Sequence, residues 1–335
     1  MNDKTIRIAI DLMGGDKAPQ CVMDGLRLFD KKNRDKNLSY ILVGNAELKA
    51  KICKKVMSRA RFVETDEVVK STDKPSLVIR NKKTSMAVCI ALVADGEADV
   101  CMSSGNTGAL MAMSKLYFKT IDGIDRPAIC TIIPTMNEPS VFLDMGASLS
   151  YTSDNLVQYA MMGSVFASIL FDIKEPKIGI INVGSEDNKG NEAIQQAAET
   201  LKASNLKDNF CGYVEGDQVT KGNVNVVVTD GFTGNVVLKA IEGSARLMKH
   251  FVTAAFKESL MAKIGYLFAK NSLSKMRDKI NPNNYNGALF LGLNKIAIKS
   301  HGGADLYGIA NAIKVSYTLA SQDVVEKIKS KMQSS

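Results

Sequence analysis

The sequence reads Cys101-Met102-Ser103-Ser104-Gly105-Asn106-Thr107-Gly108-Ala109 where a short apolar strand is predicted to run into a helix. A related joint, Val228-Thr229-Asp230-Gly231-Phe232-Thr233-Gly234-Asn235, follows later. The free N–H groups and positive dipole end of a helix attract anions, and glycine lets a phosphate approach the backbone closely. A single joint of this kind is equally typical of a capped helix with a tight turn. Several such joints at one edge of one sheet favour a binding site.

Strand segments rich in β-branched residues alternate with helical segments along nearly the whole chain. Strands are expected at 6–11, 40–44, 61–65, 99–102, 128–133, 141–144, 177–183, 224–229 and 296–299, and helices between them include 46–57, 84–94, 154–170 and 191–203. This alternation predicts an α/β class fold, a Rossmann-like α/β/α sandwich with a mostly parallel sheet. We expect one α/β/α catalytic domain over residues 1–335, with 148–152 as the alternative boundary.

The amino-acid composition is that of a folded soluble protein. The chain has 335 residues, 45% hydrophobic and 23% charged, which is ordinary for a folded soluble protein. Its apolar runs are far shorter than the roughly 18 residues of a membrane span, and residues 1–4 lead into a strand instead of a secretory apolar core. A cytoplasmic protein is therefore expected.

Cysteine and histidine usage argues against a metal site. The six cysteines are scattered without a C-x-x-C pair, and His250 and His301 are the two histidines of the sequence. Neither a zinc cage nor a multi-histidine centre is indicated, so we expect no metal and no other cofactor.

Polar and glycine-rich residues follow most of the expected strands. Because ligands of open parallel sheets bind at the carboxyl edge of the strands, we expect these residues to form one site at one edge. The sequence has no G-x-x-x-x-G-K-[ST], G-x-G-x-x-G or G-x-S-x-G motif, which disfavours P-loop, standard dinucleotide-binding and serine-hydrolase functions. The candidate site residues are Asp11, Gly14, Gly15, Asp16, Ser103, Gly105, Asn106, Thr107, Gly108, Asp144, Glu186, Lys189, Asp230, Asn235, Lys239 and His301.

Residues 246–280 form a basic amphipathic helical segment, which we expect to protrude as a helix pair interrupted near Gly265. The net charge of the chain is +8, and this segment carries eight basic residues against Glu258 and Asp278. Its apolar residues recur every fourth position from Met248 to Phe268. This pattern is typical of packing on the protein's own core or in a dimer, and equally of insertion into an anionic lipid surface. The positive field would also attract an acidic protein.

The motifs resemble, over essentially the whole chain, the bacterial PlsX family of acyl-acyl carrier protein:phosphate acyltransferases. Asp11-Leu12-Met13-Gly14-Gly15-Asp16 is similar to its opening signature, and residues 103–109 are similar to its glycine-rich loop. Further matches lie at 125–128, 143–147, 182–192, 230–235 and 298–302. Departures from the family pattern are Leu12, Ser104, Ser148, Tyr213 and Asn286.

The resemblance implies a fold similar to isocitrate and isopropylmalate dehydrogenases. It implies an enzyme that transfers a long-chain fatty acyl group from acyl carrier protein to inorganic phosphate, giving acyl phosphate for phospholipid synthesis. It also implies a homodimer, loose association with the inner face of the cell membrane, and hand-off to a membrane glycerol-3-phosphate acyltransferase, with no role for nucleic acid. Phosphate is then assigned to Asn106, Thr107 and Asn235 with Lys189 nearby, and the thioester oxygen to His301 and the glycine-rich turns.

Three other functions compete with this interpretation. A phosphotransacetylase would use coenzyme A, and a decarboxylating hydroxyacid dehydrogenase would need a carboxylate cluster for a metal, which Asp144, Glu186 and Asp230 could only imitate. A non-catalytic membrane adaptor for acyl carrier protein is the alternative from another class. Formation of acyl phosphate from the carrier-bound thioester separates all of them.

Overall fold

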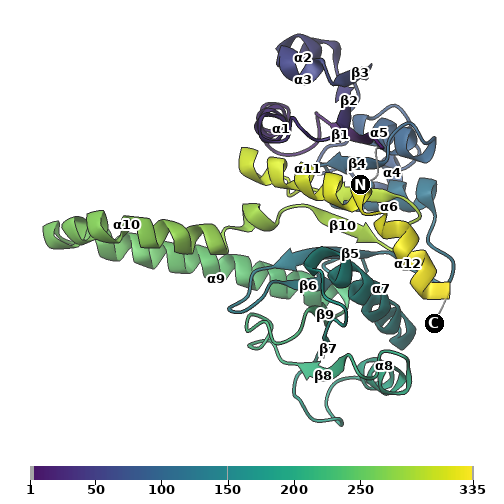
Figure 1. Ribbon diagram of the computed structural model, residues 1–335, viewed down its shortest axis with the longest axis vertical. Helices are drawn as coiled ribbons and strands as arrows, with labels where there is room; N and C mark the ends of the chain where they lie inside the picture. Colours follow the sequence, from purple (N-terminus) through teal and green to yellow (C-terminus); the bar gives the residue numbers. More distant parts are fainter. Residues whose placement is uncertain (1–3, 149, 334–335) are drawn as a thin grey trace.

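The computed structural model describes residues 4–148 and 150–333 and is built on one eleven-stranded sheet (Figure 1). Residues 1–3, which we expected to lead into the first strand, lie outside this range. The strands lie in the order β3-β2-β1-β4-β11-β10-β5-β6-β9-β7-β8. Their bounds are β1 Ile6–Asp11, β2 Leu38–Gly44, β3 Ala60–Glu64, β4 Val100–Ser103, β5 Ala128–Ile133, β6 Ser140–Leu143, β7 Ile178–Ile181, β8 Phe210–Val214, β9 Val226–Val228, β10 Ala288–Leu291 and β11 Ile296–Lys299. The predicted α/β fold with a mostly parallel sheet is confirmed.

The sheet has two parallel halves that run in opposite directions. Strands β3, β2, β1, β4 and β11 are mutually parallel, and so are β6, β9, β7 and β8. Between them, β10 is antiparallel to both β11 and β5, and β5 is antiparallel to β6. The carboxyl ends of the two halves therefore lie at opposite edges, and the expectation of a single common edge is wrong.

Helices cover both faces of the sheet. Their bounds are α1 Gln20–Lys32, α2 Ala46–Lys51, α3 Lys54–Met57, α4 Pro75–Val78, α5 Ser85–Ala94, α6 Thr107–Phe118, α7 Ser153–Phe171, α8 Glu192–Ala203, α9 Gly231–Lys257, α10 Leu260–Ile280, the 3-10 turn η1 Pro282–Tyr285, α11 Leu306–Ser321 and α12 Val324–Gln333. Along β1, Ile8 and Ile10 face the core built with α1, α7, α8, α11 and α12. Ala9 faces the opposite core, built with α5, α6 and the base of α9.

A long helical hairpin projects from this body (Figure 1). Helix α9 packs Val237, Leu238 and Ile241 on the second core and then continues outward beside α10. The chain reverses at Glu258, and Ser259 caps α10 by accepting a hydrogen bond from Ala262 N at 3.1 Å. Helix α10 runs unbroken through Gly265, so the expected interruption there is wrong. None of the helices in the described part of the chain is long and apolar enough to span a membrane.

Differences from the predicted elements have local causes. The helix expected over 46–57 is divided into α2 and α3 because Ile52 is extended. Strand β8 was missed since its sequence, Phe210-Cys211-Gly212-Tyr213-Val214, lacks a buried alternation at the sheet edge. Strand β10, Ala288–Leu291, was also missed; it contains no β-branched residue, which was the signal used for the other strands.

Candidate active site

The turns after β1 and β4 are fastened together by one buried carboxylate. Asp11, 1% exposed, accepts hydrogen bonds from Met13 N and Gly14 N, both at 3.1 Å, and from Ser103 Oγ at 2.6 Å. Ser103 Oγ in turn accepts a hydrogen bond from Gly105 N at 3.0 Å. Asp11 and Ser103 therefore hold the two glycine turns against each other.

Two glycines of the first turn leave no room for a side chain. A Cβ on Gly14 would lie 2.4 Å from Asp11 Oδ2 and 2.9 Å from Gly105 N. Gly15 has φ +113°, and its Cβ would lie 2.8 Å from Ser104 Cβ. The backbone of one turn thus approaches the other more closely than any other residue type allows.

The turn after β11 completes this group. Ser300 N donates to Ser103 O at 2.9 Å, and Asp16 N donates to Gly302 O at 3.0 Å. Asn286, at the family-atypical position, accepts a hydrogen bond from His301 N at 2.9 Å. These bonds place His301 beside the glycine turns.

The imidazole of His301 has a defined donor. Its Nδ1 accepts a hydrogen bond from Gly303 N at 3.1 Å, so the neutral ring carries its proton on Nε2. Burial, reinforced by the charge of Lys239 on α9, lowers the pKa of His301 below its usual 6.5. At neutral pH the ring is therefore an uncharged N–H donor. The first group thus contains Asp11, Gly14, Gly15, Asp16, Ser103, Gly105, His301 and, from α9, Lys239.

The start of α6 belongs to the same edge, but the Asn106 side chain is already engaged. Asn106 Oδ1 caps α6 by accepting from Ala109 N at 3.0 Å, and its Nδ2 donates to Ser71 O and Asp73 O at 3.1 and 3.0 Å. A Cβ on Gly108 would lie 2.8 Å from Pro75 Cγ. Asn106 and Gly108 thus hold the 70–75 segment over the helix start, while Thr107 is exposed.

Asp144, Asp230 and Asn235 lie at the opposite edge of the sheet. Asp144, fully buried, accepts hydrogen bonds from the backbone N–H groups of Ile129, Gly146, Ala147 and Ser148 at 2.9 to 3.2 Å. Burial raises the pKa of the Asp144 carboxyl, and these four donors oppose that rise. Asp230 caps α9 by accepting from Thr233 N at 3.0 Å. Both carboxylates are committed to the main chain.

Glu186 and Lys189 lie in an exposed turn at that same edge. The turn follows β7, which is parallel to β9, and Lys189 N donates to Glu186 O at 3.1 Å. Glu186, Lys189 and Asn235 keep exposed side chains, so they are the available polar groups of this second set.

Helix α9 connects the two sets. It begins beside Asp144, where a Cβ on Gly234 would lie 1.9 Å from Asp144 O. Asn235 and Lys239 are one helical turn apart and both exposed, so they share a face of α9. Because Lys239 lies close enough to His301 to lower its pKa, α9 extends from the second set to the first.

One buried cation of the first group was missed at the sequence level. Lys299 ends β11 and is only 9% exposed, although the other β11 residues, Ile296-Ala297-Ile298, are apolar. An ionisable residue at the end of a strand buried on both faces was the available signal. Among the described residues, no three His, Cys, Asp or Glu side chains are grouped as metal ligands.

Comparison with known proteins gives a consistent picture. The profile of the family described as "Fatty acid synthesis protein" matches residues 6–327. The phosphate acyltransferase of Rhodospirillum centenum is 45% identical over 97% of this chain and 92% of its own length. That of Paramagnetospirillum magneticum is 43% identical over 97% of this chain and 93% of its own. In three dimensions a phosphotransacetylase from Streptococcus pyogenes is similar, with a TM-score of 0.61 and 16% identity over 95% of this chain and 94% of its own, which shows a shared fold.

Proposed function

This chain belongs to the fatty acid synthesis protein family of phosphate acyltransferases, and from that premise we propose that it transfers a long-chain acyl group from acyl carrier protein to inorganic phosphate. An oxygen of phosphate attacks the thioester carbonyl carbon, the C–S bond breaks, and the carrier thiolate leaves and takes a proton from water. The product is an acyl phosphate for phospholipid synthesis.

The observation that carries this proposal is the Nε2–H donor of His301 beside two glycine turns. A phosphate dianion is itself a nucleophile, so the protein has to orient it and stabilise the oxyanion that develops on the carbonyl. His301 donates to that oxygen without adding a proton that must later be removed. The glycine turns admit the reacting groups close to the backbone.

Phosphate is assigned to the start of α6 and to α9. The Asn106 side chain is committed to the 70–75 segment, so Asn106 and Thr107 would contribute mainly first-turn N–H groups. Asn235 and Lys239 approach from α9, and Lys189 is the remaining exposed cation of the second set. Both alanine variants keep these N–H groups. We expect Asn106→Ala to raise the KM for phosphate about tenfold, because it removes the helix cap and releases the 70–75 segment at a cost of about 1.5 kcal/mol, and Thr107→Ala to change it little.

The hairpin supports peripheral attachment to the cytoplasmic face of the membrane. Leu260, Met261, Ile264, Leu267 and Phe268, here called the distal apolar face, share one side of α10, and all are exposed. Such a face in a lysine-rich hairpin suits an anionic lipid surface. There the acyl phosphate would reach a membrane glycerol-3-phosphate acyltransferase.

A homodimer is supported by a second apolar stripe, on α9. Phe232, Val236, Leu247 and Phe251 recur at helical spacing and are 52% to 63% exposed. A second copy of the chain would cover this stripe, which begins on the body of the protein and not at the hairpin tip.

The decisive assay incubates palmitoyl-acyl carrier protein with labelled phosphate and detects hydroxylamine-sensitive acyl phosphate. The fold shared with a phosphotransacetylase favours a coenzyme A thioester as the second candidate donor. A strong preference for palmitoyl-coenzyme A would support that alternative. Absence of product from both donors would contradict the proposed function.

A further inference from the structure

Lys299 is a buried amine without a carboxylate partner. Its Nζ donates to Ser104 O at 3.3 Å and to Ser300 O. Among the side chains that the structure describes, no Asp or Glu forms an ion pair with it, although the residue is only 9% exposed. A buried cation is costly unless an anion faces it.

The charged groups around Lys299 do not supply that anion. Asp11 lies at the end of β1 but is committed to Met13, Gly14 and Ser103. Asp16 lies in the following turn, and Lys239 and His301 contribute no negative charge. Burial, only partly offset by the two carboxylates, lowers the pKa of Lys299 to about 8.

A second buried polar group beside Lys299 also lacks a partner. Ser104 is 3% exposed, and among the described residues its hydroxyl has no hydrogen-bond partner. The carbonyl of the same residue accepts from Lys299. Buried polar atoms in native proteins are normally hydrogen-bonded, so an unpartnered hydroxyl next to an unpaired ammonium indicates an absent anionic ligand.

We propose that the Lys299 ammonium binds a non-attacking oxygen of the substrate phosphate beneath the glycine turns, and that the Ser104 hydroxyl, at a position where this chain departs from the family pattern, adds a second contact to the same anion. This inference rests on the proposed function for the identity of the anion. Lys299 keeps its proton throughout, and its charge offsets that of phosphate while a further oxygen attacks the thioester. It is thus a binding residue and not the acid that protonates the leaving thiolate.

The ammonium form is required, which sets a pH dependence. With Lys299 losing its proton near pH 8, kcat/KM for phosphate should fall on the alkaline side of about pH 8. Lys299→Met should raise the KM for phosphate at least tenfold at pH 7 and remove this alkaline limb. Lys299→Arg should keep both the cation and a flat profile above pH 8. Lys295→Met, at an exposed position directly before the same strand, is the matched control.

The test separates this inference from the function itself. A wild-type enzyme that forms acyl phosphate, with a folded Lys299→Met variant of unchanged phosphate KM and unchanged alkaline limb, would overturn it. If Lys299→Met does not fold, Ser104→Ala decides, because it removes one hydroxyl and should raise the phosphate KM three- to tenfold. An unchanged KM there would also overturn the proposal. Absence of any acyl phosphate from wild-type protein refutes the function instead.

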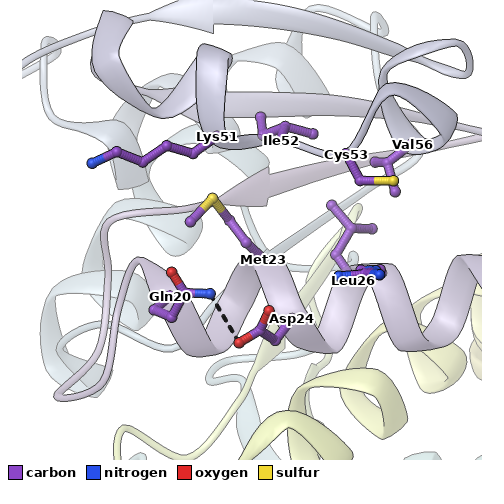
Figure 2. Close-up of a pocket in the computed structure, with 9 residues that line it drawn as sticks. Gln20, Met23, Asp24, Leu26, Lys51, Ile52, Cys53 and Val56 are labelled. Atoms are coloured by element: carbon purple, nitrogen blue, oxygen red, sulfur yellow. Dashed lines mark hydrogen bonds between the residues drawn. The ribbon is translucent and has the colours of Figure 1, made fainter.

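A different observation concerns the carrier protein. A cavity of about 300 Å³ lies between α1 and the α2–α3 turn, with Met23 and Leu26 facing Ile52 and Cys53 (Figure 2). It adjoins a second cavity of about 640 Å³, and the two share Arg27, Cys53 and Val56. We call this the α1 groove. Its lining cations are Arg27, Lys31, Arg34, Lys51, Lys54 and Lys55, against Asp24 and Asp30.

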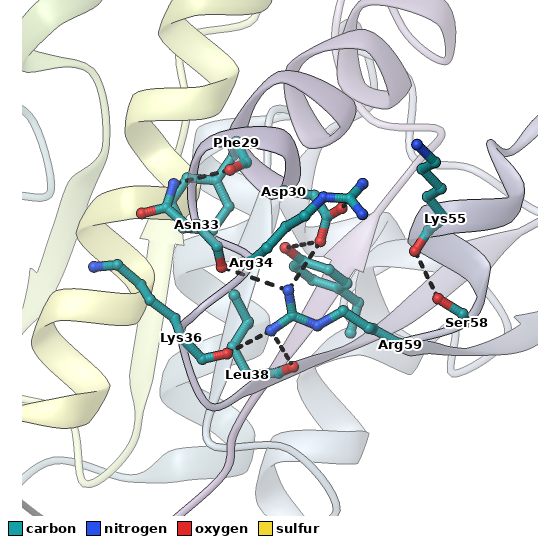
Figure 3. A network of polar contacts seen from close by, with 10 residues as sticks. Phe29, Asp30, Asn33, Arg34, Lys36, Leu38, Lys55, Ser58 and Arg59 are labelled. Atoms are coloured by element: carbon teal, nitrogen blue, oxygen red, sulfur yellow. Dashed lines mark hydrogen bonds and ion pairs between the residues drawn. The ribbon is translucent and has the colours of Figure 1, made fainter.

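The positive charge of the α1 groove is largely uncompensated. Asp30 is buried and bound by Arg59 at 3.2 Å and Arg34 at 3.5 Å (Figure 3). Arg59 also donates to Lys36 O and Leu38 O, which fixes its guanidinium beside Asp30. One carboxylate is thus used internally, and the remaining cations face solvent.

The chemistry of the α1 groove suits an acidic protein surface. Its apolar lining is buried or partly buried, whereas the exposed apolar residues of the hairpin suit lipid. The groove begins at Gln20, four residues after Asp16 in the first group. We infer that it docks the acidic surface of the acyl carrier protein named in the proposed function, with its prosthetic arm directed along α1 to His301.

A charge-reversal experiment tests this docking. Lys31→Glu/Lys54→Glu/Lys55→Glu should raise the KM for palmitoyl-acyl carrier protein at least tenfold and leave the KM for phosphate unchanged. Lys115→Glu/Lys174→Glu/Lys295→Glu, exposed elsewhere, is the charge-matched control. Equal KM values for the two triple variants would overturn the inference. So would a loss confined to binding of anionic vesicles, which would assign the groove to lipid.

Discussion

Replacing Leu267 and Phe268 with glutamate should release the protein from anionic membranes while leaving its chemistry intact. These side chains are 62% and 85% exposed, and Leu260 and Met261 beside the turn are 76% and 77% exposed. Burying one such side chain fully is worth about 1.5 to 3 kcal/mol. Scaled by exposure, the four contribute about 4 to 9 kcal/mol on insertion, of which Leu267 and Phe268 supply about half.

The double variant should therefore lose about 2 to 4 kcal/mol, or roughly thirty-fold to a thousand-fold in the partition coefficient. Each lysine near an anionic surface adds about 1 kcal/mol to the binding free energy, and salt screens this electrostatic contribution. The contribution of the apolar side chains persists at high salt. Co-sedimentation with phosphatidylglycerol vesicles measures both. Met136→Glu, 80% exposed on the body of the protein, is the matched control.

Two results would refute this reasoning. Wild-type protein that stays in the supernatant at low salt would show that the distal apolar face does not meet lipid. A double variant that still sediments, but has changed its oligomeric state, would assign that face to contact between copies of the chain. Activity on soluble palmitoyl-acyl carrier protein should persist in the variant, because Lys239, in the first half of α9, and His301 near it lie far from the hairpin tip.

Three further outcomes are expected. His301→Ala should lower kcat about a hundredfold with little change in phosphate KM, and His301→Gln should retain part of the rate. Wild-type activity should also fall as the pH drops through the lowered pKa of His301, because a proton on Nδ1 would face the Gly303 N–H group. A pH profile that stays flat on the acid side would contradict this. Asp144→Asn should destabilise the fold by about 3 kcal/mol in urea unfolding, because its amide would face a backbone N–H; unchanged stability would show that those bonds contribute nothing. Gly15→Ala should abolish activity, whereas Gly96→Ala, also at positive φ but with nothing within 4 Å, should cost only stability; equal activities would remove the close approach to Ser104 from the argument.

The sequence predicted the fold where local pattern and tertiary position agree. Strands β1, β5 and β11 begin and end at the predicted residues because each is a short segment rich in isoleucine that is mostly buried in the sheet. The relative direction of neighbouring strands could not be predicted from these local patterns. Three successive antiparallel pairings, β11 with β10, β10 with β5 and β5 with β6, leave the two halves running in opposite directions and place Asp144 and Asp230 at the edge opposite Asp11.

The candidate site was predictable as a set of residues but not as an arrangement. The glycine-rich turns after buried strands pointed to Gly14, Gly15 and Gly105 as candidate substrate-binding positions, and in the structure all three pack closely against other parts of the protein. The use of each carboxylate depends on which N–H groups surround it, and only the folded chain shows that Asp144 is committed to four of them. Lys299 escaped notice because a lysine in a basic chain is ordinarily a surface residue.

The length of helix α9 also sets the distance between His301 and the tip of the hairpin. Lys239, beside His301, and the turn at Glu258 are nineteen residues apart on one continuous helix, about 28 Å at 1.5 Å per residue. With the hairpin tip in a bilayer and α9 perpendicular to the membrane, the reacting carbonyl would lie at about that height above the lipid. The labile acyl phosphate would then travel a short and constant distance from the site to the membrane. Shortening α9 by two turns would reduce that distance by about 11 Å without altering any group that touches substrate.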